Sequence, residues 1–308
     1  MIICLSFVGI LPEYIIDNIH QIRCYYAGEV YLITNDLNSV HLKKIEESNY
    51  NIHIVDYNTV RCDRFLEVAN TNKLKILTLA DLHGREELFL RSFERFFLLQ
   101  NLLKQTNTTD CLFLELDNLI YDDPHKWIDS FSKHELCYMF DSAQNCWGGA
   151  RFASGLMYIK NADALDGFLS CILDMINNDH GFISEMLALG RYYENNQDKV
   201  GVLPSYWKDS SVPSIAYLNY DKYDDTIFDA SAMGIYLLGM DPFHTNGVIV
   251  KNLKSHWADI DYSQQKFEWK TDEKGRKSPY IWNGEKWLLI NVLHVHSKDL
   301  KGGLSVKE

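Results

Sequence analysis

The sequence predicts an α/β fold in which a Rossmann-type sheet is flanked by helices within a single continuous domain. Apolar runs alternate with helical periods through the first 120 residues, a pattern typical of parallel βαβ units. The run Leu112-Phe113-Leu114 has no polar alternation, as expected for a strand that is buried on both faces. The chain has 308 residues, of which 46% are hydrophobic, and this is enough to bury a substantial core.

Periods of two and of 3.6 residues divide the chain into strands and helices. The elements expected in the first half are strand 1–8, helix 11–26, strand 29–34, helix 38–48, strand 51–56, a strand or short helix over 74–79, helix 85–104 and a strand over 111–121. In the second half, strands are expected over 152–159 and 287–298. The terminal residues 301–308 are glycine-rich and polar, and we expect them to be at least partly disordered.

Composition and charge exclude several classes of protein. The formal charge is −12, from 30 basic and 42 acidic residues, without the basic footprint that a nucleic-acid partner requires. No apolar window reaches the length of about 18 residues that a membrane span requires, so we expect no integral membrane segment. The seven cysteines are odd in number and lack C-x-x-C spacing, which favours a reducing compartment and predicts a cytoplasmic protein.

Two carboxylates follow the apolar run that starts at Cys111. In an extended segment, side chains two positions apart share a face, so Glu115 and Asp117 are expected to point the same way. Ligands of open α/β sheets collect at the carboxyl ends of the strands. Carboxylates there can hold Mg²⁺ or Mn²⁺, whose shell is often completed by substrate phosphates. Capping of the turn that begins at Tyr121 is the alternative explanation for these acidic residues.

A second polar cluster ends the apolar run that starts at Trp287. His294 and His296 share a face of that expected strand, and Lys298 follows them. Imidazole is a transition-metal ligand, and a lysine ammonium is a point charge suited to phosphate. If this cluster meets the acidic pair, the two together form a metal and phosphate site.

These motifs resemble those of nucleotide-sugar-dependent glycosyltransferases of the GT-A fold, distantly including the glycogenin-like transferases. Glu115-Leu-Asp117 resembles their Asp-any-Asp signature, and His294 to Lys298 resembles their terminal metal and diphosphate motif. Weaker similarities occur in the order of that family at 1–9, 30–36, 84–104, 152–159 and 183–187. The resemblance implies a GT-A-like mixed sheet. It also implies that residues 1–123 bind the nucleotide sugar, that 124–300 bind the acceptor and complete the metal site, and that 301–308 form a tail.

The resemblance also implies roles for particular residues and a divalent cofactor, Mn²⁺ or Mg²⁺. The expected metal ligands are Asp117, Glu115, His294 and His296. The expected donor-binding residues are Asn35, Asp36, Arg91, Arg95, Glu115, Ser154, Gly155 and Lys298. Glu185 and Asp241 are the candidate catalytic bases if the reaction inverts the sugar configuration, whereas a retaining enzyme can use the leaving phosphate as its base.

The implied activity is metal-dependent transfer of a sugar from a nucleoside-diphosphate sugar to a hydroxyl acceptor such as a glycan. Uridine is the expected base, with guanosine as the alternative. Two other functions stay open at this point, a metal-dependent phosphohydrolase and a non-catalytic protein that binds nucleotide sugars. The phosphohydrolase would also use strand-end carboxylates, but the D-x-D-x-T arrangement of an aspartyl-phosphate enzyme is absent from the sequence.

Overall fold

A computed structural model describes residues 1–72, 88–142, 150–179, 183–240 and 262–306. The described strands are β1 (Ile2–Phe7), β2 (Val30–Thr34), β3 (Ile52–Asp56), β4 (Cys111–Leu114), β5 (Asn118–Ile120), β6 (Leu136–Ser142), β7 (Arg151–Ile159), β8 (Val200–Leu203), β9 (Ile227–Phe228), β10 (Phe267–Thr271), β11 (Lys277–Trp282) and β12 (Trp287–His294). The described α-helices are α1 (Ile15–Tyr25), α2 (Val40–Glu47), α3 (Tyr57–Val60), α4 (Asp63–Thr71), α6 (Leu88–Thr106), α7 (Ile128–Phe131), α8 (Asp166–Asn178), α9 (Glu185–Asn195) and α10 (Ala232–Leu238). Two of the 3₁₀ turns matter below, η2 (Pro124–Trp127) and η9 (Leu300–Gly302).

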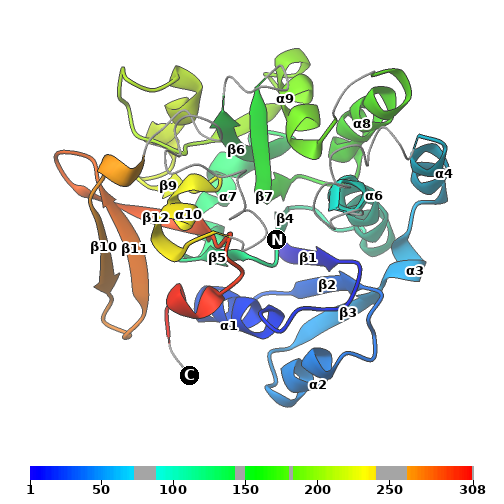
Figure 1. Cartoon of the computed structure of the whole chain (residues 1–308), viewed down its shortest axis with the longest axis horizontal. Coiled ribbons are helices and arrows are strands. Elements are labelled where there is room, and N and C mark those ends of the chain that lie inside the picture. The colour runs from blue at the N-terminus through cyan, green and yellow to red at the C-terminus, as the bar shows by residue number, and fades with distance from the viewer. Residues whose placement is uncertain (73–87, 143–149, 180–182, 241–261, 307–308) are drawn as a thin grey trace.

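The strands form two sheets (Figure 1). The large sheet has seven strands in the order β3-β2-β1-β4-β7-β6-β8. Its β3-β2-β1-β4 half is parallel, whereas β7 runs antiparallel to both of its neighbours. The second sheet has the order β10-β11-β12-β5, with β9 paired to β12. The mixed α/β architecture expected from the sequence is therefore confirmed.

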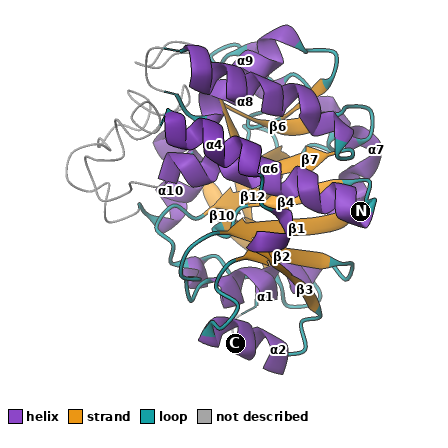
Figure 2. Cartoon of the chain, turned by 90° about the vertical axis from the view of Figure 1, so that its right-hand side faces the viewer, coloured by secondary structure: helices purple, strands orange, loops and turns teal. Residues whose placement is uncertain are grey.

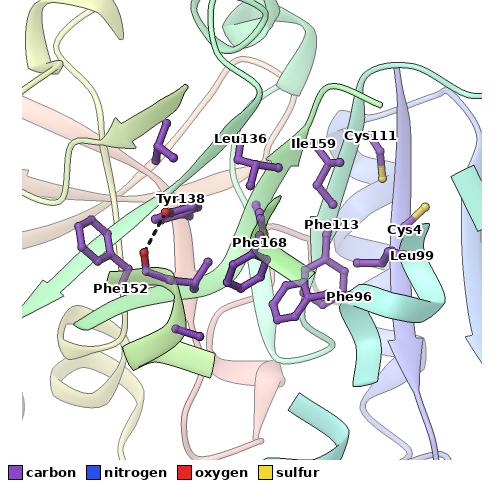
Figure 3. Packing of buried hydrophobic residues seen from close by; sticks show 14 of the residues in the cluster. Cys4, Phe96, Leu99, Cys111, Phe113, Leu136, Tyr138, Phe152, Ile159 and Phe168 are labelled. Carbon is purple, nitrogen blue, oxygen red and sulfur yellow. Dashed lines mark hydrogen bonds between the residues drawn. The ribbon is translucent and has the colours of Figure 1, made fainter. Parts of the chain in front are cut away.

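The core lies on both faces of the large sheet, which explains the unbroken apolar run in β4. Cys111 and Phe113 face one buried cluster, which includes α6, α8 and α9, while Leu112 and Leu114 face the other, which includes α1. Phe96 of α6 packs against both Phe113 of β4 and Phe168 of α8 (Figure 3). Figure 2 shows α4, α6, α8 and α9 gathered on one side of the large sheet. Both faces of β4 are thus buried, and its carboxyl end is directed to the boundary between the two sheets.

Several element predictions need correction. Helix α1 begins at Ile15 rather than at residue 11, because Pro12 and the turn up to Tyr14 precede it. The expected strand over 111–121 is instead two strands that belong to different sheets. Helices α3 and α4 were not predicted from the sequence. Polar residues in these helices obscure the buried apolar side that Phe65 and Ala69 form in α4. The segment 74–79 lies outside the described residues.

The carboxyl-terminal segment is the largest correction. Residues 301–305 were expected to belong to a partly disordered tail. The structure instead continues into η9, and Leu300, Leu304 and Ser305 are buried. The disorder was expected in part because Gly302 and Gly303 lie in this segment. An added Cβ at Gly303 would lie 2.6 Å from the Leu119 side chain, so this glycine permits close packing.

Candidate active site

Glu115 and Asp117 lie on the turn that joins β4 to β5. The backbone N–H of Glu115 donates to the Gly155 carbonyl of β7 at 2.9 Å, and the Asn118 N–H closes the turn on the Glu115 carbonyl at 3.0 Å. The expectation that both residues continue an extended strand is therefore wrong. The turn nevertheless keeps their carboxylates together, because oxygens of Glu115 and Asp117 and a ring nitrogen of His294 all lie within 4.8 Å of one another.

The structure brings the terminal cluster to Asp117. His294 is the last residue of β12, which pairs with β5, and its Nε2 lies 3.2 Å from Oδ2 of Asp117. The Lys298 ammonium donates to the same carboxylate oxygen. The backbone is joined as well, since the Val295 N–H donates to the Asp117 carbonyl at 2.7 Å. Asp117 itself is buried, with 7% of its side chain exposed, so these polar partners replace the water that the carboxylate loses on folding.

The orientation of His294 suits a metal ligand. Its Nδ1 lies 3.4 Å from the Ala230 carbonyl, so a proton on Nδ1 would leave the Nε2 lone pair directed towards Asp117. His296 lies beside it, with the two ring centroids 5.9 Å apart, but it is outside the three-residue group that converges with Glu115 and Asp117. Of the two predicted histidines, His294 is the one that belongs to this group among the described residues.

Arg95 links the acidic turn to two neighbouring elements. From α6 its guanidinium donates to Glu115 and, at 2.8 Å, to the Ser154 hydroxyl of β7, and it lies 3.6 Å from the Glu185 carboxylate. Burial raises the pKa of Glu115, but the positive charges of Arg95, His294 and Lys298 outweigh burial and lower that pKa overall. Glu115 is therefore ionised at neutral pH and available as an oxygen ligand.

Glu185 and Gly155 border this centre. Glu185 is the first residue of α9 and accepts a hydrogen bond from the Ser92 hydroxyl at 2.9 Å. Gly155 lies against Asn118, and an added Cβ would meet the Asn118 amide group at 2.9 Å. The β7 strand can approach the acidic turn this closely only with glycine at that position.

The remaining predicted site residues have other partners or lie outside the described residues. Asn35 and Asp36 follow β2, where their side-chain oxygens accept the N–H groups of Gly9 at 2.7 Å and Leu11 at 3.0 Å. They therefore fasten the loop after β1 at the carboxyl edge of the sheet. Arg91 pairs with the buried Glu94 at 2.5 Å. Asp241 lies outside the described residues.

The sequence reading missed two buried carboxylates close to this centre. Asp229 accepts the N–H groups of Met233 and Gly234, at 2.9 and 2.7 Å, and that of His294 at 3.1 Å. Burial raises the pKa of Asp229 to about 6. Asp141 pairs with the buried Arg151 at 3.1 Å, and both aspartates line a small pocket together with Ser205 and Tyr262. One feature of the sequence could have identified Asp229 as a site residue. It is polar and directly follows the short apolar pair Ile227-Phe228.

We expect Gly234→Ala to destabilise the protein by about 3 kcal/mol, since overpacking of a close contact costs roughly this amount. An added Cβ would lie 1.8 Å from the His294 carbonyl oxygen, so α10 or the end of β12 must move. Chemical denaturation would measure the loss. Gly167→Ala is the control, because the atoms nearest to its Cβ would be those of the Tyr192 side chain, at 3.0 Å or more, rather than backbone atoms. Equal stabilities of the two variants would contradict the close α10–β12 contact.

The seven-stranded mixed sheet flanked by helices is like that of GT-A glycosyltransferases, and comparison with solved structures shows this likeness of fold. An active-site mutant of LgtC aligns with a TM-score of 0.50 at 12% identity, over 75% of this chain and 85% of that chain. The apo form of mouse xyloside xylosyltransferase 1 aligns at 0.46 and 11% identity, over 72% of this chain and 92% of that one. GlyE of Streptococcus pneumoniae aligns at 0.41 and 14% identity, and this chain spans 45% of its length.

At these identities the comparisons show the fold alone. No family model and no curated protein sequence matches the chain. The LgtC alignment supports the GT-A resemblance inferred from the sequence, and none of these alignments singles out the glycogenin-like transferases. None of the described helices is both long and apolar enough to cross a membrane. The function must therefore be argued from the site itself.

Proposed function

We propose that this chain is a metal-dependent glycosyltransferase that moves a sugar from a nucleoside-diphosphate sugar to a hydroxyl of an acceptor such as a glycan. The observation that carries the proposal is the convergence of Glu115, Asp117 and His294 with Lys298 and Arg95 in a GT-A fold. Two carboxylates and an imidazole suit Mn²⁺ or Mg²⁺, and the two cations suit a diphosphate. The donor set therefore fits the implied cofactor.

Each residue then has a separable task in the proposed reaction. Glu115, Asp117 and His294 would hold the divalent ion, which when bound would neutralise charge on the departing nucleoside diphosphate. Lys298 would hold the diphosphate, and Arg95 would orient Glu115 and Ser154 beside the sugar. Glu185 lies 3.6 Å from Arg95, where it can position the acceptor or accept its proton. Asp241 remains a candidate from the sequence alone.

The division of labour along the chain is part of the same proposal. Residues 1–123 would bind the nucleotide sugar, and residues 124–300 would bind the acceptor and complete the metal site. The donor pocket would contain Asn35, Asp36, Arg91 and Gly155. In the metal site, His296 would assist His294. A cytoplasmic location remains the prediction of the cysteine pattern. Neither the phosphohydrolase nor the non-catalytic binding protein gains a specific supporting observation from the described residues.

The proposal predicts that uridine diphosphate with Mn²⁺ stabilises the protein against heat. A ligand that binds only the native state raises the melting temperature, and a concentration 100 times the dissociation constant contributes about 2.7 kcal/mol. A thermal-shift panel of nucleoside diphosphates and nucleotide sugars, each with Mn²⁺ or with a chelator, would measure base, sugar and metal dependence. Stabilisation that survives the chelator would favour a metal-independent binding protein. If no nucleoside diphosphate shifts the transition at saturation, the glycosyltransferase proposal is wrong.

A further inference from the structure

Lys298 has an unusual backbone conformation at the proposed diphosphate site. Its φ is +65°, in the left-handed region that residues with a Cβ rarely adopt. Such a residue persists only when its surroundings hold it. On its amino-terminal side, the Lys298 N–H donates to the Val295 carbonyl at 3.0 Å, and Val295 is itself bonded to the Asp117 backbone. On its carboxyl-terminal side, residues 299–305 are held first by the buried Leu300 and by the Gly303 carbonyl, which accepts from the Tyr121 hydroxyl at 2.7 Å.

Those residues are fixed at Ser305, which is buried and uses all its polar groups. The Ser305 N–H donates to Oε1 of Gln21 at 2.8 Å, and the Ser305 carbonyl accepts the Lys277 N–H at 2.9 Å. The Ser305 hydroxyl lies 2.8 Å from Nε2 of Gln21 and 2.9 Å from the Tyr25 hydroxyl. Figure 1 shows this carboxyl-terminal segment, in red, beside α1. We call the Gln21–Ser305 pair the terminal anchor.

The same face of α1 also holds the strand that follows Asp117. Gln21 is fully buried, and its Nε2 donates to the Ile120 carbonyl of β5 at 2.6 Å. Asn18, one helical turn earlier and also fully buried, donates from Nδ2 to the Asn118 carbonyl at 2.8 Å. Fully buried polar side chains are uncommon unless their hydrogen bonds are needed. Gln21 thus joins two segments, the one that follows Asp117 and the one that follows Lys298.

We propose that the terminal anchor is a positioning device that keeps Lys298 in its left-handed conformation against Asp117. The role in donor binding rests on the proposed function, whereas the conformational role does not. Asp117 enters the site from the turn before β5, Lys298 enters from the segment after β12, and Gln21 bonds to the chain downstream of each. Loss of the anchor frees Lys298 to leave the left-handed region, and its ammonium then spends less time at Asp117.

The conformational role is tested without any ligand. Hydrogen exchange of residues 295–299, followed by mass spectrometry, would be compared in the wild type, Gln21→Leu, Ser305→Ala and the control Gln100→Leu. Gln100 is matched because it is a buried glutamine on another helix, α6, that donates to the Ala162 carbonyl at 3.1 Å and to Asp166 at 2.6 Å. We expect roughly tenfold faster exchange in both anchor variants and wild-type exchange in the control. Unchanged exchange at 295–299 in Ser305→Ala, the milder variant, would overturn the proposal.

The functional role is tested with pyrophosphate and Mn²⁺ as probes, each titrated calorimetrically. Both anchor variants should bind Mn²⁺-pyrophosphate roughly tenfold more weakly, as is usual when residues that orient a site are removed, while binding of Mn²⁺ alone changes less than about twofold. In a Lys298→Ala background the anchor substitution should have no further effect. An undiminished effect in that background would show that the anchor does not act through Lys298. A wild type that binds no Mn²⁺-pyrophosphate would count against the proposed function, and the exchange experiment would still decide the anchor.

Discussion

Replacing Asp117 with asparagine is expected to reduce sugar transfer by about 10³-fold or more while the fold is retained. Asp117 is the group on which the centre converges, because it lies 3.2 Å from His294 Nε2 and accepts from Lys298. An amide of the same shape keeps the packing but removes the negative charge that a divalent ion requires. Steady-state rates with saturating donor and Mn²⁺ would measure the loss, and circular dichroism would monitor the fold.

The control for this prediction is Asp122→Asn. Asp122 lies in the same segment and also pairs with a lysine, Lys126, at 2.6 Å, but the Lys126 side chain is 61% exposed beside η2. Ion pairs in which the lysine is in solvent are worth less than about 1 kcal/mol, so this variant should keep full activity. A folded Asp117→Asn enzyme that is as active as Asp122→Asn would eliminate the proposed metal site.

The sequence pattern alone predicted the site residue that follows the end of a buried strand, Asp117. An unbroken apolar run identifies a strand buried on both faces, and the carboxyl edge of such a strand is where ligands bind, so Asp117 could be named in advance. The resemblance to GT-A transferases then paired it with His294 and Lys298, which the structure brings into contact with it. Periodicity alone contains no information on that contact, because the pairing of β12 with β5 joins segments far apart in the chain.

The residues that were missed depend on tertiary contacts rather than on local pattern. Asp229 is significant only because β9 pairs with β12 and α10 packs against the end of β12. Gln21 belongs to an ordinary amphipathic helix, and its role is visible only once Ser305 is seen beside it. The terminal segment was misread for the same reason, since its glycines indicate disorder locally but permit close packing against Leu119. Arg91 lies one helical turn from Arg95 and pairs with Glu94, a contact that the sequence pattern did not predict.

Arg95→Met is expected to destabilise the metal-free protein by about 2 kcal/mol, because breaking a partly buried ion pair leaves an uncompensated charge. The Arg95 and Glu115 side chains are only 13% and 21% exposed, so little solvent screens their attraction. Without the guanidinium, Glu115 loses the partner that contributes most to its low pKa, and Ser154 and Glu185 lose a shared neighbour. Transfer activity should also fall, by roughly 10²-fold, since the donor pocket is no longer aligned.

The Arg95→Met variant also tests whether Glu115 and Asp117 belong to a metal site or to an ion-pair network with a purely structural role. If Glu115 and Asp117 bind a divalent ion, Mn²⁺ supplies the positive charge that the variant lacks, and its stabilising effect should be larger in Arg95→Met than in the wild type. Thermal unfolding with and without Mn²⁺ would measure both differences. Arg191→Met is the matched control, because Arg191 also pairs with a carboxylate, through two hydrogen bonds to Asp179, but is 41% exposed. We expect it to cost less than about 1 kcal/mol and to leave the response to Mn²⁺ unchanged. If Mn²⁺ stabilises the wild type and Arg95→Met equally, the ion does not bind beside Glu115.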